Sequence, residues 1–186
     1  PKSLIYNRLP LNITHQKHPK KLKKGDTIAI VSTARKVSNK ELAPAILFAK
    51  KMGLEVYLGK TIEAKDNQYA GDDSLRAQDF QDALDNPNIK AIWCARGGYG
   101  TIRMVDLLNF TQFIQQPKWI IGYSDVTVLH SHINSLNIPT IHGQMCLEIE
   151  KKSKASRDTL QQALFADNPD ISYSLDASLP CRFGTA

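Results

Sequence analysis

The segment Trp119-Ile-Ile-Gly-Tyr-Ser-Asp125 decides the expected fold, because an apolar strand ends in it and a helical pattern, residues 126–136, follows at once. A serine on a sharp turn between a strand and a helix is typical of an exposed nucleophilic hydroxyl. The helix N-terminus beside it favours a developing oxyanion. The same position also suits a helix cap, so Ser124 and Asp125 are candidates for both roles.

Strands and helices alternate on both sides of this segment. Apolar runs predict strands at 27–32, 55–58, 89–95, 119–122 and 140–142. Helical spacing, with a capping box at Ser38-Asn-Lys-Glu41, predicts helices at 38–52, 74–84, 102–108, 109–115, 126–136 and 156–165. This alternation predicts an α/β fold with a doubly wound, mostly parallel sheet.

A second glycine-rich turn, Arg96-Gly-Gly-Tyr-Gly100, ends the strand before this segment. Ligands of doubly wound sheets bind at the carboxyl ends of the strands, so we expect Gly97, Gly98 and Ser124 on one rim. The backbone N–H of Asp125, together with that of Gly97 or Gly98, could stabilise an oxyanion. The turn lacks the spacing of a dinucleotide or P-loop phosphate motif.

Two arginines near this turn are candidates for binding a substrate carboxylate in bidentate fashion. Arg96 and Arg103 could equally be structural partners of acidic residues such as Asp106 or Asp125. We expect the structural role for Arg103 and leave both roles open for Arg96.

Tyr99 and His142 are the other candidate substrate-binding residues. Tyr99 could cover a ligand, although a packed turn aromatic is the safer expectation. His142 ends the last expected strand, on the same rim as Ser124, where it could line the site or act as a general base. His130 and His132 lie on the helix after Ser124, and we expect neither to reach back to the serine.

Composition limits the class of protein. The 186 residues allow one full domain, with 42% hydrophobic and 23% charged residues. No apolar run approaches the roughly 20 residues that span a bilayer, and the N-terminus shows no signal peptide. We therefore expect a cytoplasmic protein without membrane contact.

The charge distribution and the cysteine spacing indicate which partners and ligands we do not expect. The net charge of +6 arises largely from a lysine run at 17–24, which no aromatic residues interrupt, so we expect a solvated segment and no nucleic-acid partner. The cysteines, at 94, 146 and 181, show no metal-ligand spacing. We expect reduced thiols, no metal site and no cofactor.

Several motifs resemble the N-terminal half of the LD-carboxypeptidase family. They are Tyr69-Ala-Gly-Asp72, Ala91-Ile-Trp-Cys-Ala-Arg-Gly-Gly-Tyr-Gly100, Ile121-Gly-Tyr-Ser-Asp-Val-Thr127 and Thr140-Ile-His-Gly143. The resemblance runs from about residue 22 to residue 145, and the order and spacing of the two glycine motifs are specific. Members of this family are serine peptidases that remove D-alanine from the L,D bond of murein tetrapeptides, and a microcin C immunity peptidase is among them.

The resemblance implies a flavodoxin-like or class I glutamine-amidotransferase-like domain. It implies Ser124 as the nucleophile and the backbone N–H groups of Asp125 and Gly98 as the oxyanion hole. It also implies that a smaller C-terminal domain supplies the Glu and His of a Ser-His-Glu triad. The expected division is an N-terminal extension (1–21), the nucleophile-bearing domain (22–166) and a linker (167–186) towards that absent domain.

Three functions remain as hypotheses. The first is hydrolysis of the L,D bond of a murein peptide, with the C-terminal domain and, in a homodimer, a second copy of the chain as partners. The second is cleavage of peptidyl or acyl-sulfamoyl adenylates, as in the immunity branch. The third is a non-catalytic module that binds a ligand or dimerises. Because a nucleophile without its base is weak, we expect the 186 residues alone to be inactive.

Overall fold

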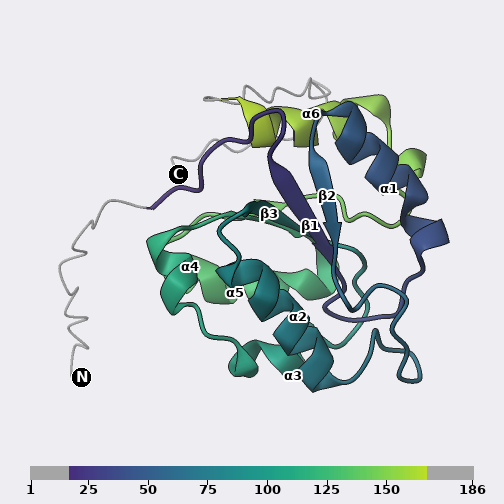
Figure 1. Cartoon of the computed structure of the whole chain (residues 1–186), viewed down its shortest axis with the longest axis vertical. Coiled ribbons are helices and arrows are strands. Elements are labelled where there is room, and N and C mark those ends of the chain that lie inside the picture. Colours follow the sequence, from purple (N-terminus) through teal and green to yellow (C-terminus); the bar gives the residue numbers. More distant parts are fainter. Residues whose placement is uncertain (1–16, 167–186) are drawn as a thin grey trace, which may run out of the picture.

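Five parallel strands form one sheet in the order β2-β1-β3-β4-β5, and helices cover both of its faces (Figure 1). The computed structural model describes residues 17–166. The strands are β1 (Thr27–Val31), β2 (Glu55–Leu58), β3 (Ile89–Cys94), β4 (Trp119–Gly122) and β5 (Ile141–His142). This strand order is that of flavodoxin-type sheets, so the expected α/β fold class is confirmed.

The helices divide between the two faces of the sheet. They are α1 (Asn39–Lys51), α2 (Asp73–Asp85), α3 (Thr101–Met104), α4 (Thr111–Gln115), α5 (Thr127–Ser135) and α6 (Lys154–Phe165), with 3-10 turns η1 (Val105–Leu107), η2 (Ser124–Val126) and η3 (Ile149–Lys151). Figure 1 shows α1 and α6 on one face and α2 to α5 on the other.

Local sequence signals set most of the helix ends. The capping box at the start of α1 is confirmed, since Ser38 Oγ accepts the Glu41 N–H and the Glu41 carboxylate accepts the Ser38 N–H at 2.8 Å. The Ser38 N–H and the Ser38 hydroxyl both donate to the Glu41 carboxylate and lower its pKa. The helix ends before Gly53, whose φ of 84° only glycine adopts at low cost.

The continuous helices expected at 102–108 and 109–115 were too long. In the structure α3 stops at Met104, η1 follows, and α4 starts only at Thr111. Asn109 interrupts the helix because its side chain accepts the Thr111 N–H at 2.9 Å and its own N–H donates to Gln81. Side-chain hydrogen bonds of this kind compete with the helical pattern.

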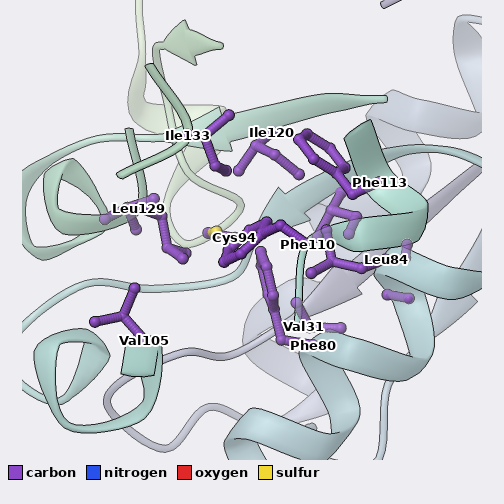
Figure 2. Close-up of a cluster of buried hydrophobic side chains, with 14 of the residues drawn as sticks. Val31, Phe80, Leu84, Cys94, Val105, Phe110, Phe113, Ile120, Leu129 and Ile133 are labelled. Atoms are coloured by element: carbon purple, nitrogen blue, oxygen red, sulfur yellow. The ribbon is translucent and has the colours of Figure 1, made fainter. Parts of the chain in front are cut away.

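Alternate residues of each central strand enter opposite cores. Figure 2 shows the core beneath α2, α4 and α5, where Val31, Cys94 and Ile120 contact the helix side chains. Ile30 and Trp93 face the other way, towards α1 and α6. Both faces are therefore covered, which explains the unbroken apolar strands. Burial raises the pKa of the Cys94 thiol to about 12, so it is an inert core residue.

The described part of the expected N-terminal extension already lies against the α/β body. Lys17 Nζ in this segment donates to Ile114 O at 3.1 Å, and Leu22, the first residue of the expected domain, is buried with its N–H donating to Leu164 O at 2.8 Å. The first 16 residues of the extension and the whole expected linker, 167–186, lie outside the described residues. Across residues 17–166, no helix has the length and apolar character needed to cross a membrane.

A buried carboxylate joins α2 to the carboxyl ends of β1 and β2. Asp79 is fully buried and accepts the Lys60 N–H at 2.8 Å, the Thr61 N–H at 2.9 Å and the Thr61 hydroxyl at 2.5 Å. The Thr61 hydroxyl oxygen in turn accepts the Ser32 N–H at 2.8 Å. These bonds fix the start of the rim on which the glycine-rich turns lie.

Replacing Asp79 by Asn tests whether its hydrogen bonds to Lys60 and Thr61 anchor α2 to the sheet. The amide has one acceptor oxygen and presents an N–H₂ group to a donor, so we expect Asp79→Asn to lower the free energy of unfolding by about 2–3 kcal/mol in urea denaturation. The matched control is Asp82→Asn on the same helix, where the carboxylate pairs with Lys60 at the surface. That variant should lose less than about 1 kcal/mol, and equal losses in the two variants would contradict the anchor.

Candidate active site

Ser124 lies on a strained turn directly after β4. Its φ of 59° is in the left-handed region, which non-glycine residues rarely adopt, and its side chain is exposed. Gly122, two residues earlier, leaves no room for a side chain, since a Cβ there would lie 2.8 Å from Val126 Cγ1. The strand therefore turns sharply and presents the hydroxyl to solvent.

The helix-cap alternative for Ser124 and Asp125 is wrong. The 3-10 turn η2 separates the strand from α5, which begins at Thr127, and no side chain accepts a hydrogen bond from the first turn of η2 or α5. The backbone strain at Ser124 is thus not explained by capping.

The Asp125 carboxylate bonds across to the second glycine-rich turn. Its Oδ2 accepts the Thr101 N–H at 3.0 Å and the Thr101 hydroxyl at 2.7 Å. The Thr33 hydroxyl lies 2.9 Å from the same threonine oxygen. The start of α3, the serine turn and the end of β1 are therefore joined by one buried hydrogen-bond chain.

Gly97 and Gly98 bring the second turn against the serine. A Cβ on Gly97 would lie 3.5 Å from Ser124 Cβ, and a Cβ on Gly98 would lie 2.6 Å from Arg35 Cδ. Gly98 also has a φ of 122°. Over residues 17–166 the backbone N–H groups of these two glycines make no hydrogen bond, so both remain available as donors. The two turns share one rim, as their positions after parallel strands lead one to expect.

Arg76, for which no role was expected, joins the loop after β1 to the loop after β3 beneath this rim. Its guanidinium is buried, and Nη1 donates to Thr33 O at 2.7 Å and to Gly100 O at 2.9 Å. Gly100 has a φ of 146°, and a Cβ there would lie 2.6 Å from Arg76 Nη1. Burial lowers the pKa of Arg76, and the ion pair with Asp73 opposes that shift. Two signals could have revealed this role: its place on the buried face of α2, and the motif Arg76-Ala-Gln-Asp79, which follows Tyr69-Ala-Gly-Asp72 and also resembles the LD-carboxypeptidase family.

Arg103 has the structural role that we expected, but with a different partner. Its Nη2 lies 2.8 Å from Asp73 Oδ2, so it pairs with neither Asp106 nor Asp125. This hydrogen bond lowers the pKa of Asp73. The cap of α2 is Asp72, which accepts the Leu75 N–H at 2.7 Å.

Arg96, Tyr99 and His142 all lie at the rim. Arg96 is half-buried, and its Nη1 donates to Lys36 O at 3.1 Å. The expectation that Tyr99 packs in its turn was wrong, because the side chain is 52% exposed. The exposed His142 ring contacts Tyr123 and His130 at centroid distances of 6.4 and 5.7 Å. Within the described residues no hydrogen bond joins His142 to Ser124.

His130 supports the serine turn from inside the protein. Its Nε2 donates to Gly122 O at 2.9 Å, and the Gly143 N–H donates to the same carbonyl at 2.9 Å. His130 does not reach Ser124, as we expected. Burial lowers its pKa, and its Nδ1 has no partner among residues 17–166. The neutral imidazole therefore joins the end of β4 to α5, while the Gly143 N–H joins it to the segment after β5.

A cavity of about 760 Å³ lies at the opposite, amino edge of the sheet. Lys118, which lines this cavity, donates from Nζ to Ala83 O at 2.9 Å and to Asn86 O at 2.8 Å. Both carbonyls lie at the C-terminal end of α2, where the helix dipole is negative. Burial lowers the pKa of Lys118 to about 8. Lysines 20, 21, 23 and 24 of the basic run are exposed, as expected of a solvated segment.

No group of three or more His, Cys, Asp or Glu side chains between residues 17 and 166 is arranged to hold a metal ion. At the rim, the exposed Ser124 hydroxyl lies beside backbone N–H groups of Gly97 and Gly98 that are unused within residues 17–166.

Comparison with known proteins gives a family match over most of the sheet. The model of the LD-carboxypeptidase N-terminal domain matches residues 28–143. A probable murein peptide carboxypeptidase of Bacillus subtilis is 38% identical over 128 residues, which cover 68% of this chain and 40% of that protein. A murein tetrapeptide carboxypeptidase of Pseudomonas aeruginosa is 32% identical over 158 residues, covering 83% and 52%.

The fold is also found in a solved structure. The structure of MccF in complex with glutamyl sulfamoyl guanosine matches with a TM-score of 0.75 at 24% identity, over 84% of this chain and 49% of that one. The chain thus spans about half the length of the relatives that it matches.

The buried His130 should make stability depend on pH. Because its pKa in the folded state lies below the ordinary 6.5, the unfolded chain takes up the proton first, and the folded state loses stability as pH falls through and below that value. We expect the free energy of unfolding to fall more steeply between about pH 7 and pH 5 in the wild type than in His130→Gln. Parallel pH curves for the two proteins would contradict this role.

Proposed function

The chain belongs to the LD-carboxypeptidase family, and we propose that its protein is a serine carboxypeptidase that releases D-alanine from the L,D bond of murein tetrapeptides, with Ser124 as nucleophile. The strained, exposed Ser124 at the β4 elbow, with Gly97 packed against it, is the observation that carries the proposal. A hydroxyl in this position is accessible to a peptide carbonyl and lies at a helix start.

Two backbone groups form the proposed oxyanion hole. The Gly98 N–H is unused within residues 17–166, and the Asp125 N–H follows the nucleophile at the start of the helical segment. Positive potential at this end of the helix favours the negative charge that develops on the carbonyl oxygen. Gly97, Tyr99, Arg96 and His142 surround this point and are the proposed substrate-binding residues.

The proposed base lies outside this chain. Within the described residues the Ser124 side chain has no hydrogen-bond partner, whereas a nucleophilic serine needs a base in contact. We assign the base and its orienting carboxylate to the His and Glu of a C-terminal domain, in keeping with the family resemblance. The same proposal places the domain boundary at about residue 166 and the protein in the cytoplasm. It also includes a homodimer and a reaction that uses no cofactor.

The reaction proceeds by covalent catalysis. The Ser124 hydroxyl attacks the carbonyl of the L,D bond while the histidine takes its proton. The oxyanion is held by the two N–H groups until D-alanine leaves with the proton from the histidine. Water then attacks the acyl-serine by the same route and releases the shortened peptide.

Ser124→Ala tests the nucleophile in the protein expressed from its complete reading frame. We expect D-alanine release from an L,D-tetrapeptide to fall by about a thousandfold or more, because the covalent step is lost. Ser131→Ala is the matched control, an exposed serine on α5 that should retain full activity. Release that survives in Ser124→Ala would refute the assignment, and turnover of an acyl-sulfamoyl adenylate in place of the tetrapeptide would move the substrate to the immunity branch.

The 186 residues alone should behave differently. Without a base in contact with Ser124, we expect no measurable release of D-alanine from the same peptide at enzyme concentrations where the complete protein turns over. Chromatographic detection of free D-alanine measures the release by the 186-residue chain and by the complete protein. Robust turnover by the short chain, abolished by Ser124→Ala, would overturn this expectation and make His142 the base.

A further inference from the structure

We propose that Arg35 forms the subsite that binds the terminal carboxylate of the substrate. This inference rests on the proposed carboxypeptidase function and adds the group that would make the enzyme select a free chain end. Arg96 and Arg103 were the candidates expected from the sequence for this task, and Arg35 was not among them. The structure separates the three arginines by position and by partner.

Arg35 lies at the correct edge of the sheet on a well-held backbone. It follows β1 by four residues, and its carbonyl accepts the Ser32 hydroxyl at 2.6 Å. The neighbouring backbone pairs with the segment before α2, since the Lys36 N–H donates to Gln68 O and the Ala70 N–H donates to Ala34 O, both at 3.0 Å. A binding side chain on a rigid backbone loses little entropy when a ligand arrives.

The Arg35 stem rests on the glycine that carries the proposed oxyanion donor. A Cβ on Gly98 would lie 2.6 Å from Arg35 Cδ and 2.8 Å from Cγ, while a Cβ on the adjacent Gly97 would lie 3.5 Å from Ser124 Cβ. The two glycines thus lie between the serine and the arginine. Any side chain at Gly98 would displace Arg35.

This spacing fits the geometry of a carboxypeptidase substrate. The scissile carbonyl and the terminal carboxylate of a C-terminal residue are separated by three bonds, roughly 4 Å. Their two binding groups must therefore be neighbours in the protein. An oxyanion donor on Gly98 and a guanidinium whose stem packs on Gly98 meet this requirement.

The charge of Arg35 is available for a ligand. Its Nη2 donates to the uncharged Gln68 Oε1 at 3.2 Å, and the residue is exposed. Arg103 and Arg76 both pair with Asp73. Arg96 donates to a backbone carbonyl and interacts electrostatically with Glu41 and Glu148.

Arg157, the remaining arginine in the described part of the chain, donates to three backbone carbonyls, two in η3 and one at Lys152 directly after it. Arg35 is therefore the arginine between residues 17 and 166 that combines an exposed head group, bonded to a neutral acceptor, with a stem packed on Gly98. Its planar guanidinium suits bidentate binding of a carboxylate better than a lysine would.

The experiment compares two substrates in the protein expressed from its complete reading frame. One is an L,D-tetrapeptide with a free terminal carboxylate, and the other is the same peptide ending in an amide. For Arg35→Gln we expect kcat/KM on the acid to fall by about 10- to 100-fold, mainly through KM, with hydrolysis of the amide within about twofold of wild type. Arg35→Lys should keep part of the preference for the acid, because it retains the charge without the bidentate geometry.

Lys36→Gln is the matched control, since it removes one positive charge from the adjacent exposed position, where Lys36 Nζ donates to Asn67 O. It should keep the wild-type ratio of acid to amide hydrolysis. Activity on the amide also shows that each variant is folded.

An unchanged acid-to-amide ratio in Arg35→Gln, with release that still requires Ser124, would overturn the carboxylate subsite and leave the proposed function standing. If the wild-type protein releases no D-alanine in a Ser124-dependent manner, both the proposed function and the subsite are overturned.

Discussion

The buried guanidinium of Arg76 is the interaction on which the carboxyl edge of the sheet depends. It donates to Thr33 O after β1 and to Gly100 O after β3, and its charge is balanced by Asp73. Backbone carbonyls in loops lack the partners that strands provide, and a buried carbonyl left without a donor is costly. One arginine thus lets two irregular loops be buried side by side.

Above Arg76, three glycines of the turn after β3 bring the backbone close to neighbouring side chains. Gly100 passes over Arg76, Gly97 lies against Ser124, and Gly98 lies against Arg35. At Gly98 and Gly100 a Cβ would lie 2.6 Å from an arginine side chain, and the positive φ disfavours other residues as well, whereas at Gly97 the nearest atom, Met145 Cε, would lie 3.2 Å away. The strained φ of Ser124 belongs to the same arrangement, because the Asp125–Thr101 hydrogen bonds hold the serine turn against the glycine turn.

The amino edge of the sheet has a structural role, and the carboxyl edge carries the candidate active site. Helix C-termini gather at the amino edge, where Lys17 and Lys118 donate to their last carbonyls. Helix starts gather at the carboxyl edge, where the unused N–H groups of Gly97 and Gly98 lie beside the serine turn and the exposed Arg35 packs on Gly98. This polarity follows from parallel strands with right-handed crossovers, which send every helix back in the same direction.

The strands, the capping box of α1 and the doubly wound class follow from the sequence by itself, because apolar runs and caps act over a few neighbouring residues. The elbow at Ser124 and the turn at Gly97 and Gly98 were recognisable too, since glycine and serine after a strand carry local conformational meaning.

The partners across the rim were decided only by the tertiary structure. Asp73 pairs with Arg103, Arg76 joins Thr33 to Gly100, and Arg35 reaches Gly98 from 63 positions away in the chain. The sequence favoured Arg96 and Arg103 as carboxylate ligands because they lie near the glycine motif along the chain. Proximity in space is set instead by the order of strands in the sheet, which places β1 beside β3 and brings their loops together.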